Sequence, residues 1–240
     1  MADSASSADE SLGKRKREQG EQDGRSPKRQ TNYSDVVTIL VGRDEVPFVV
    51  HKELLCQCSP FFAAACSREW LPDSGNKTVP MPSIKPKVFT QYIDRVYKNT
   101  IDLGLPQAPS KATERVCDEH GHAFLRAIRL YLAADILLDE ALKMDIINQL
   151  IRFVDHGTLS FHAKHVQKIW NNTTENAGLR RYLLDYLATS GKATSEWLRG
   201  TKDKLPLDFY VELAIRQAEA YDTTTSLRPS WNNRCNYHDH

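Results

Sequence analysis

The sequence lacks an excess of charge of either sign. Its 240 residues include 32 basic and 31 acidic side chains, which leaves a formal net charge of +1. A nucleic-acid-binding protein usually shows a concentrated basic surplus, because it neutralises roughly 6 to 10 phosphates. The composition therefore gives no support to DNA or RNA as a partner.

Long apolar runs are also missing. No run approaches the ~20 apolar residues that a membrane-spanning helix needs, and the polar N-terminus lacks the apolar core of a secretory signal. We therefore expect no membrane partner and a location in the nucleus or the cytoplasm. The cysteines are few and odd in number, five in all, so reduced thiols are expected instead of a disulfide framework.

Catalytic motifs are missing as well. The sequence contains no phosphate loop, dinucleotide fingerprint or nucleophile elbow. Cys56, Cys58 and Cys66 lie in apolar helical segments, where burial raises the pKa of a thiol and suppresses the reactive thiolate. His51 lies where a strand meets a helix, and we interpret it as a structural hydrogen-bonding residue. We predict a protein without enzymatic activity and without a cofactor.

One spacing of candidate zinc ligands occurs twice. The residues are Cys117, His120 and His122, and again Cys235, His238 and His240. Three such ligands could hold zinc in principle, but a structural zinc site usually has four, each supported by further hydrogen bonds. The histidines are also too close together for zinc-finger spacing, so we predict no metal site.

The first 34 residues are polar and charged, and they cannot bury enough apolar surface to offset the entropy of ordering. We predict a disordered tail over 1–34. Two basic clusters ten residues apart resemble a bipartite nuclear localisation signal; they consist of Lys14, Arg15, Lys16 and Arg17, and of Lys28 and Arg29. The alternative is a merely solvated charge mixture, because the tail also contains six acidic residues. We predict a nuclear location, with the cytoplasm as the alternative.

Order is expected from Asp35 onward. Runs rich in β-branched residues predict strands over 35–41 and 46–50 with a turn between them, and the prolines of segment 77–82 are typical of an edge strand. Short helices are predicted over 53–58 and 60–67, separated where Ser59 caps and Pro60 begins the second helix.

Further helices are expected in the rest of the chain. A single apolar stripe predicts a helix from Pro86 to about Asn99, followed by a short extended segment over 101–103. The polar segment 104–121 is interpreted as a loop insertion. Helices over 124–138 and 140–154 follow, with Asp139 as the cap between them.

The C-terminal part predicts four more helices, over 161–171, 179–189, near Trp197 and over 206–221, before a polar tail over 226–240. Six aromatic residues lie on or beside these helices: Trp170, Tyr182, Tyr186, Trp197, Phe209 and Tyr210. We interpret them as a helical core. The alternative is that some of them line a groove for a partner peptide.

Four motifs in this order resemble the BTB/POZ domain. They are Asp35-Val36-Val37, Val50-His51-Lys52, Ser59-Pro60-Phe61-Phe62, and Leu130 to Asp135 before Leu142 to Ile151. More narrowly, the chain is similar to fungal proteins with this domain. The resemblance implies an α+β fold over 35–154, in which helices surround a small mixed sheet, followed by an α-helical C-terminal extension over 155–225.

The resemblance also implies an adaptor that binds other proteins and dimerises, without catalysis. Its signature residues here are Asp35, His51, Lys52 and Ser59. In the family the first two helices supply much of the dimer contact, which points to Leu54, Leu55, Phe61 and Phe62 as the partner surface. The alternative is that these four side chains belong to the core.

Two features depart from the longer animal members of the family. A basic residue two positions before the histidine pairs there with the opening aspartate, but Val49 occupies that position here, so Asp35 is expected to lack this partner. The N-terminal elements that exchange between subunits are also not apparent, which leaves homodimerisation open. Two alternative functions remain: a substrate adaptor of a cullin-type ubiquitin ligase, through 97–103 and 161–221, and a DNA-associated transcriptional regulator.

Overall fold

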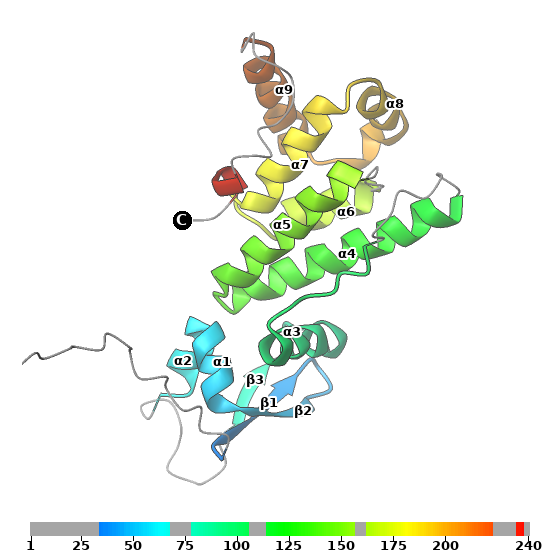
Figure 1. The fold of residues 1–240 in the computed structure, drawn as a ribbon. Coiled ribbons are helices and arrows are strands. Elements are labelled where there is room, and N and C mark those ends of the chain that lie inside the picture. The colour runs from blue at the N-terminus through cyan, green and yellow to red at the C-terminus, as the bar shows by residue number, and fades with distance from the viewer. Residues whose placement is uncertain (1–33, 68–77, 106–113, 157–161, 223–233, 238–240) are drawn as a thin grey trace, which may run out of the picture. The chain divides into compact units, whose positions relative to one another are not determined.

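The computed structural model describes residues 34–67, 78–105, 114–156, 162–222 and 234–237 (Figure 1). All of them belong to one unit that spans Asn32–His240. The predicted disordered tail up to residue 33, with its six nuclear-localisation residues, lies outside the described residues.

A three-stranded mixed sheet begins the ordered chain. Strands β1 (Val36–Val41) and β2 (Val46–His51) form the predicted antiparallel hairpin, and β3 (Thr78–Met81) pairs parallel to β1, which gives the order β2-β1-β3. The turn requires Gly42, because its φ is +80° and the ring of Pro86 would lie 3.1 Å from an added Cβ atom. β3 is an edge strand, as its prolines predict.

Three helices pack beside the sheet. α1 (Lys52–Cys58) and α2 (Pro60–Ala65) meet at Ser59, whose side chain accepts a hydrogen bond from the N–H of Phe62, so the predicted cap is confirmed. α3 (Pro86–Lys98) ends at Asn99, which adopts the left-handed conformation with φ +51°. The segment 101–103 is not a strand, although Leu103 is buried in the core.

Helices α4 (Glu114–Ile136) and α5 (Glu140–His156) form an antiparallel pair. α4 begins ten residues before the predicted start at Phe124, so the predicted loop insertion is wrong for residues 114–121. The polar N-terminal turns of α4 lack an apolar stripe, and the sequence pattern therefore concealed them. Asp139 caps α5 as predicted, because its carboxylate accepts the N–H of Leu142 at 2.9 Å.

The C-terminal helices continue the same hydrophobic core. They are α6 (Ala163–Trp170), α7 (Gly178–Thr189), α8 (Lys192–Thr201), the 3-10 turn η1 (Lys202–Lys204), α9 (Leu207–Asp222) and the 3-10 turn η2 (Arg234–Tyr237). Four of the six aromatic residues are buried, namely Trp170, Tyr182, Tyr186 and Phe209, and Trp197 and Tyr210 are half-buried, so the core interpretation is confirmed.

The predicted polar tail over 226–240 is wrong at its one described segment. Tyr237 of η2 is buried in the core, with its ring packed edge-on against Tyr182. The rest of that tail, with His238 and His240, lies outside the described residues.

The arrangement confirms the predicted α+β class, with a small mixed sheet, surrounding helices and a helical C-terminal part. Within the described ranges, no helix combines the length and the apolar character that crossing a bilayer requires.

Candidate protein-interaction surface

Asp35 and Lys52 face each other at the open end of the hairpin. Val36 pairs with His51, so the residues just beyond them, Asp35 and Lys52, are also opposite. The N–H of Lys52 donates to the carbonyl of Asp35 at 2.9 Å, and Lys52 Nζ lies 3.7 Å from Asp35 Oδ2. Asp35 has no basic partner at position 49, where Val49 stands, but Lys52 provides one from another position. Both side chains are partly exposed, so the ion pair itself contributes little to stability.

His51 joins β2 to α3. Its Nδ1 lies 2.7 Å from the hydroxyl oxygen of Tyr97, and its backbone N–H donates to the same oxygen at 3.3 Å. The Tyr97 hydroxyl oxygen accepts from the backbone N–H, and the tautomer of His51 determines which of the two groups donates in the contact between Nδ1 and the hydroxyl. The predicted structural role of His51 is confirmed.

Ser59 joins the α1–α2 junction to the α4–α5 turn. Its buried hydroxyl donates to the carbonyl of Leu137 at 2.5 Å while it accepts the N–H of Phe62 at 3.2 Å. A sequence pattern predicts the contact with Phe62, because it is local. It does not predict the contact with Leu137, which is 78 positions from Ser59. Ser59 therefore holds the turn between α4 and α5 against the junction of α1 and α2, and Figure 1 shows this turn near α1.

Only two of the four predicted partner-surface residues, Leu54 and Phe61, are partly exposed. Leu55 and Phe62 are both 0% exposed, so they are core residues and the prediction is wrong for them. Phe62 packs edge-on against Phe89 of α3. Leu54 and Phe61, one position earlier on each helix, pack against the core but remain half-buried.

An exposed apolar surface remains around Leu54 and Phe61, and the exposed carboxylates of Asp135 and Glu140 flank its part at the α4–α5 turn. Pro60, Ala63 and Ala64 are exposed on α2, and at the α4–α5 turn Ile136 is 43% and Leu138 is 53% exposed. We call this the α1–α2 surface; it consists of Leu54, Pro60, Phe61, Ala63, Ala64, Ile136 and Leu138. Sequence reasoning missed Ile136 and Leu138, because only the fold brings them beside α2.

Leu138 is also strained. Its φ is +56°, in the left-handed region that a side chain with a Cβ atom adopts at a cost of roughly 1–2 kcal/mol. Glycine is the usual residue at such a helix end. A bulky apolar side chain that is both strained and exposed points to a role outside the stability of the monomer.

A buried ion pair holds the α4–α5 turn against α3. Arg95 Nη1 lies 3.4 Å from Asp139 Oδ2, and both side chains are buried. Burial raises the pKa of the Asp139 carboxyl, which Arg95 and the N–H of Leu142 counteract. The hydroxyl of Tyr92 is buried beside this pair without a hydrogen-bond partner among the described residues, and burial raises its pKa. The ion pair thus holds the α4–α5 turn, which contributes Ile136 and Leu138 to the α1–α2 surface, against α3.

The three described thiols fit a structural role. Burial raises the pKa of Cys56 and Cys58, and it raises that of Cys66 to about 11. Each therefore stays protonated at neutral pH, as the sequence predicts. Nowhere in the described part of the chain do three His, Cys, Asp or Glu side chains form a group that could hold a metal ion, but the side chains of Cys117, His120 and Cys235 lie outside that part.

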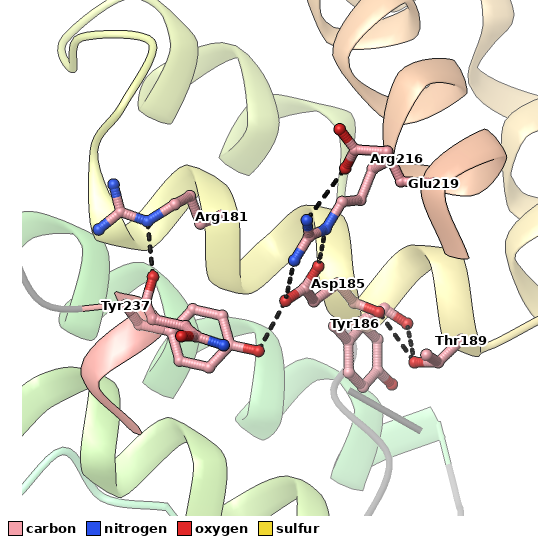
Figure 2. Close-up of polar contacts among 8 residues, drawn as sticks. Arg181, Asp185, Tyr186, Thr189, Arg216, Glu219 and Tyr237 are labelled. Carbon is pink, nitrogen blue, oxygen red and sulfur yellow. Dashed lines mark hydrogen bonds and ion pairs between the residues drawn. The ribbon is translucent and has the colours of Figure 1, made fainter. Parts of the chain in front are cut away.

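A second polar centre was missed by sequence reasoning. Figure 2 shows Asp185 of α7 between Arg216 of α9 and Tyr237 of η2. Arg216 donates from Nε to Oδ1 and from Nη2 to Oδ2 at 3.0 Å, and the Tyr237 hydroxyl donates to Oδ2 at 2.7 Å. Burial and the adjacent carboxylate raise the pKa of Tyr237, so its hydroxyl remains a donor at neutral pH. This centre joins η2 and α9 to α7.

Comparison with protein families places residues 25–116 in the BTB/POZ domain. The match covers less than half of the chain and does not bear on a fungal origin. No curated protein matches the sequence. The domain supports a protein-interaction adaptor role, because BTB domains mediate protein–protein interactions and dimerisation.

Proposed function

Because the chain contains a BTB/POZ domain, we propose that it is a non-enzymatic adaptor that pairs with a second copy of itself through the α1–α2 surface. The observation that carries the proposal is the exposed apolar patch around Leu54 and Phe61, extended by the exposed Ile136 and Leu138. Small residues such as Ala63 and Ala64 allow another backbone to approach closely. A stable interface needs roughly 800 Å² from each partner, with an apolar centre.

The substitution Ala64→Glu tests the pairing. In a two-fold dimer the same patch meets itself, so the new carboxylate would be buried in an apolar interface on both subunits, without a compensating partner. Ala64 is exposed in the single chain, so the fold is expected to tolerate the change. Sedimentation equilibrium should show a dimer for the unchanged protein and at least about tenfold weaker association for Ala64→Glu, equivalent to about 1.4 kcal/mol or more.

Ala193→Glu provides the matched control. Ala193 is an exposed helical alanine in the first turn of α8, where a carboxylate is favourable. It should leave the dimer intact. A monomer at about 100 μM of the unchanged protein, equivalent to a free energy of association weaker than about −5.5 kcal/mol, would contradict the proposal, as would equal losses in both variants.

We also propose nuclear import through the basic clusters of the tail. Lys14 to Arg17 and Lys28 to Arg29 are spaced so that two acidic grooves of an import receptor could bind both. Deletion of Lys14 to Arg17 in a fluorescent fusion should abolish nuclear accumulation, and unchanged accumulation would reject the signal. The cullin-adaptor and transcriptional-regulator alternatives stay predictions, and so does the similarity to fungal proteins.

A further inference from the structure

Five cationic side chains gather where α4, α6 and the start of α3 meet. We call them the α4–α6 basic patch: Lys85, Arg126, Arg129, Lys164 and Lys168. Arg126 and Arg129 lie one turn apart on α4, and Lys164 and Lys168 lie one turn apart on α6, so each pair shares a helix face. Lys85, Arg129 and Lys164 are exposed, and the other two are half-buried.

Packing of α6 against α4 brings these helix faces together. The rings of Phe124 and His165 meet edge-on with centroids 5.6 Å apart, and an added Cβ atom on Gly121 would lie 3.4 Å from His162 Nε2. Farther along α4, the guanidinium of Arg126 lies over the backbone of Gly104. Lys85 and Arg129 lie near Lys168, Lys164 and Arg129 lie near His165, and Arg126 lies one helical turn from Arg129, so the five cations span three elements.

The Asp102 carboxylate lies near one edge of the patch, because it accepts the N–H of Gly104, over which Arg126 lies, but the described contacts include no ion pair between Asp102 and Arg126. Elsewhere Arg95, Lys98, Lys143, Arg180 and Arg216 each form an ion pair, whereas the described part of the chain shows no ion pair for any of the five patch cations. Burial, followed by the like charges of Arg129 and Lys85, lowers the pKa of Lys168. The pKa of His165 is lowered as well, first by burial and then by its neighbours His162, Lys164, His122 and Arg129.

Mutual repulsion makes this arrangement unfavourable in the isolated chain, and it would be relieved by a bound anion. The overall charge of the protein is only +1, so the positive potential here is local and not a consequence of composition. A surface of this kind steers and binds negatively charged partners.

We propose that the α4–α6 basic patch binds an acidic peptide segment of a partner protein. The inference rests on the proposed adaptor function, which implies that the partner is a protein. The patch lies on other helices than the α1–α2 surface. Five cations match four or five carboxylates or phosphorylated side chains. The 8 residues of α6 extend about 12 Å, roughly the length of four extended residues.

A protein segment fits this surface better than a nucleic acid does. Single-stranded nucleic acids are usually held by exposed aromatic rings on which the bases stack, but Phe124 and Trp170, the nearby rings of α4 and α6, are buried. The five cations are also fewer than the roughly 6 to 10 phosphate contacts typical of duplex binding.

The test uses fluorescence anisotropy with the full chain and a labelled peptide that contains five consecutive glutamates. The unchanged protein should bind this peptide at about 50 mM salt and more weakly at about 200 mM, because salt screens the contacts. The double substitution Arg129→Glu and Lys168→Glu should weaken binding at least about tenfold, equivalent to about 1.4 kcal/mol. Lys164→Glu, on an exposed position, provides a second variant that perturbs folding less.

The matched control is Arg199→Glu with Lys202→Glu, which changes the net charge equally at exposed positions in α8 and η1. It should alter affinity by less than about threefold, equivalent to about 0.65 kcal/mol. The proposal is overturned by absence of peptide binding at low salt, by equal losses in control and patch variants, or by tighter patch-dependent binding of single-stranded DNA of the same charge. Sedimentation of the same samples reports dimerisation separately, so failure of the adaptor proposal is distinguishable.

Discussion

Individual residues show which contacts follow from local chemistry. Ser59 and Asp139 cap helices as their types and positions predict, because a cap is formed within three or four residues. Leu138 is different. No local rule favours leucine in the left-handed conformation, and its φ of +56° is imposed by the turn that connects α4 to α5.

Replacement of Leu138 by glycine should therefore change stability and association in opposite directions. Leu138→Gly removes the left-handed strain, and we expect the free energy of unfolding to rise by about 0.5–1 kcal/mol. It also removes an apolar side chain from the α1–α2 surface, so the dimer should weaken. Urea unfolding and sedimentation equilibrium measure the two effects. A stabilised variant with unchanged dimerisation would exclude Leu138 from the interface.

The packing of α6 against α4 shows how an element changes the chemistry of its side chains. His165 is 1% exposed between the two helices. Burial, reinforced by His162, Lys164 and other positive neighbours, lowers the pKa of His165 to about 4. The histidine is therefore neutral in the folded protein at physiological pH, where it packs edge-on against Phe124.

The free energy of unfolding should therefore depend on pH. The pKa of His165 in the folded protein lies below its ordinary value of 6.5, so protonation favours the unfolded chain. The contribution of neutral His165 to the free energy of unfolding is complete above about pH 6.5 and is lost as the pH falls through about 4. Between pH 7 and pH 4 we expect a loss of about 2–3 kcal/mol from this residue.

Urea unfolding of the unchanged protein and of His165→Gln at several pH values isolates this contribution. Other titrating groups are common to both proteins, so only the difference between them matters. The advantage of the unchanged protein should shrink by about 2 kcal/mol or more from pH 7 to pH 4.5. A difference that stays constant over this range would show that His165 does not titrate as its burial requires.

The whole molecule shares one hydrophobic core from the sheet to η2. Buried side chains continue from Val37 and Phe62 through α4 and α5 to Tyr182 and Tyr237 without a break. The hydroxyl of Tyr182 donates to the carbonyl of Leu150 at 3.0 Å, which joins α7 to α5. The helical C-terminal part is thus packed as a continuation of the domain core.

Loss of the Tyr237 hydroxyl should lower the free energy of unfolding, because this hydroxyl joins η2 to α7. Tyr237→Phe removes a buried hydrogen bond to the Asp185 carboxylate, and we expect unfolding to become easier by about 1.5 kcal/mol in urea. Tyr210→Phe is the control, because the Tyr210 hydroxyl donates to the carbonyl of Lys202 in an exposed setting and should contribute less. Equal effects of the two substitutions would argue against Asp185 as an anchor.

The sequence alone determined the properties that depend on near neighbours. Runs of β-branched residues marked the hairpin, and caps and prolines marked most helix ends. Ordered motifs such as Val50-His51-Lys52 and Ser59 to Phe62 indicated the BTB/POZ fold. Each of these signals lies within a few residues, where backbone sterics and local hydrogen bonds act.

Only the tertiary structure decided which side chains are covered and which remote groups meet. It buried Leu55 and Phe62 but left Leu54 and Phe61 at the surface, and it placed Lys52 rather than a residue at position 49 beside Asp35. It also brought Tyr237 to Asp185 and gathered the five cations of the basic patch. Burial and long-range pairing depend on how elements pack against one another, which no local pattern encodes.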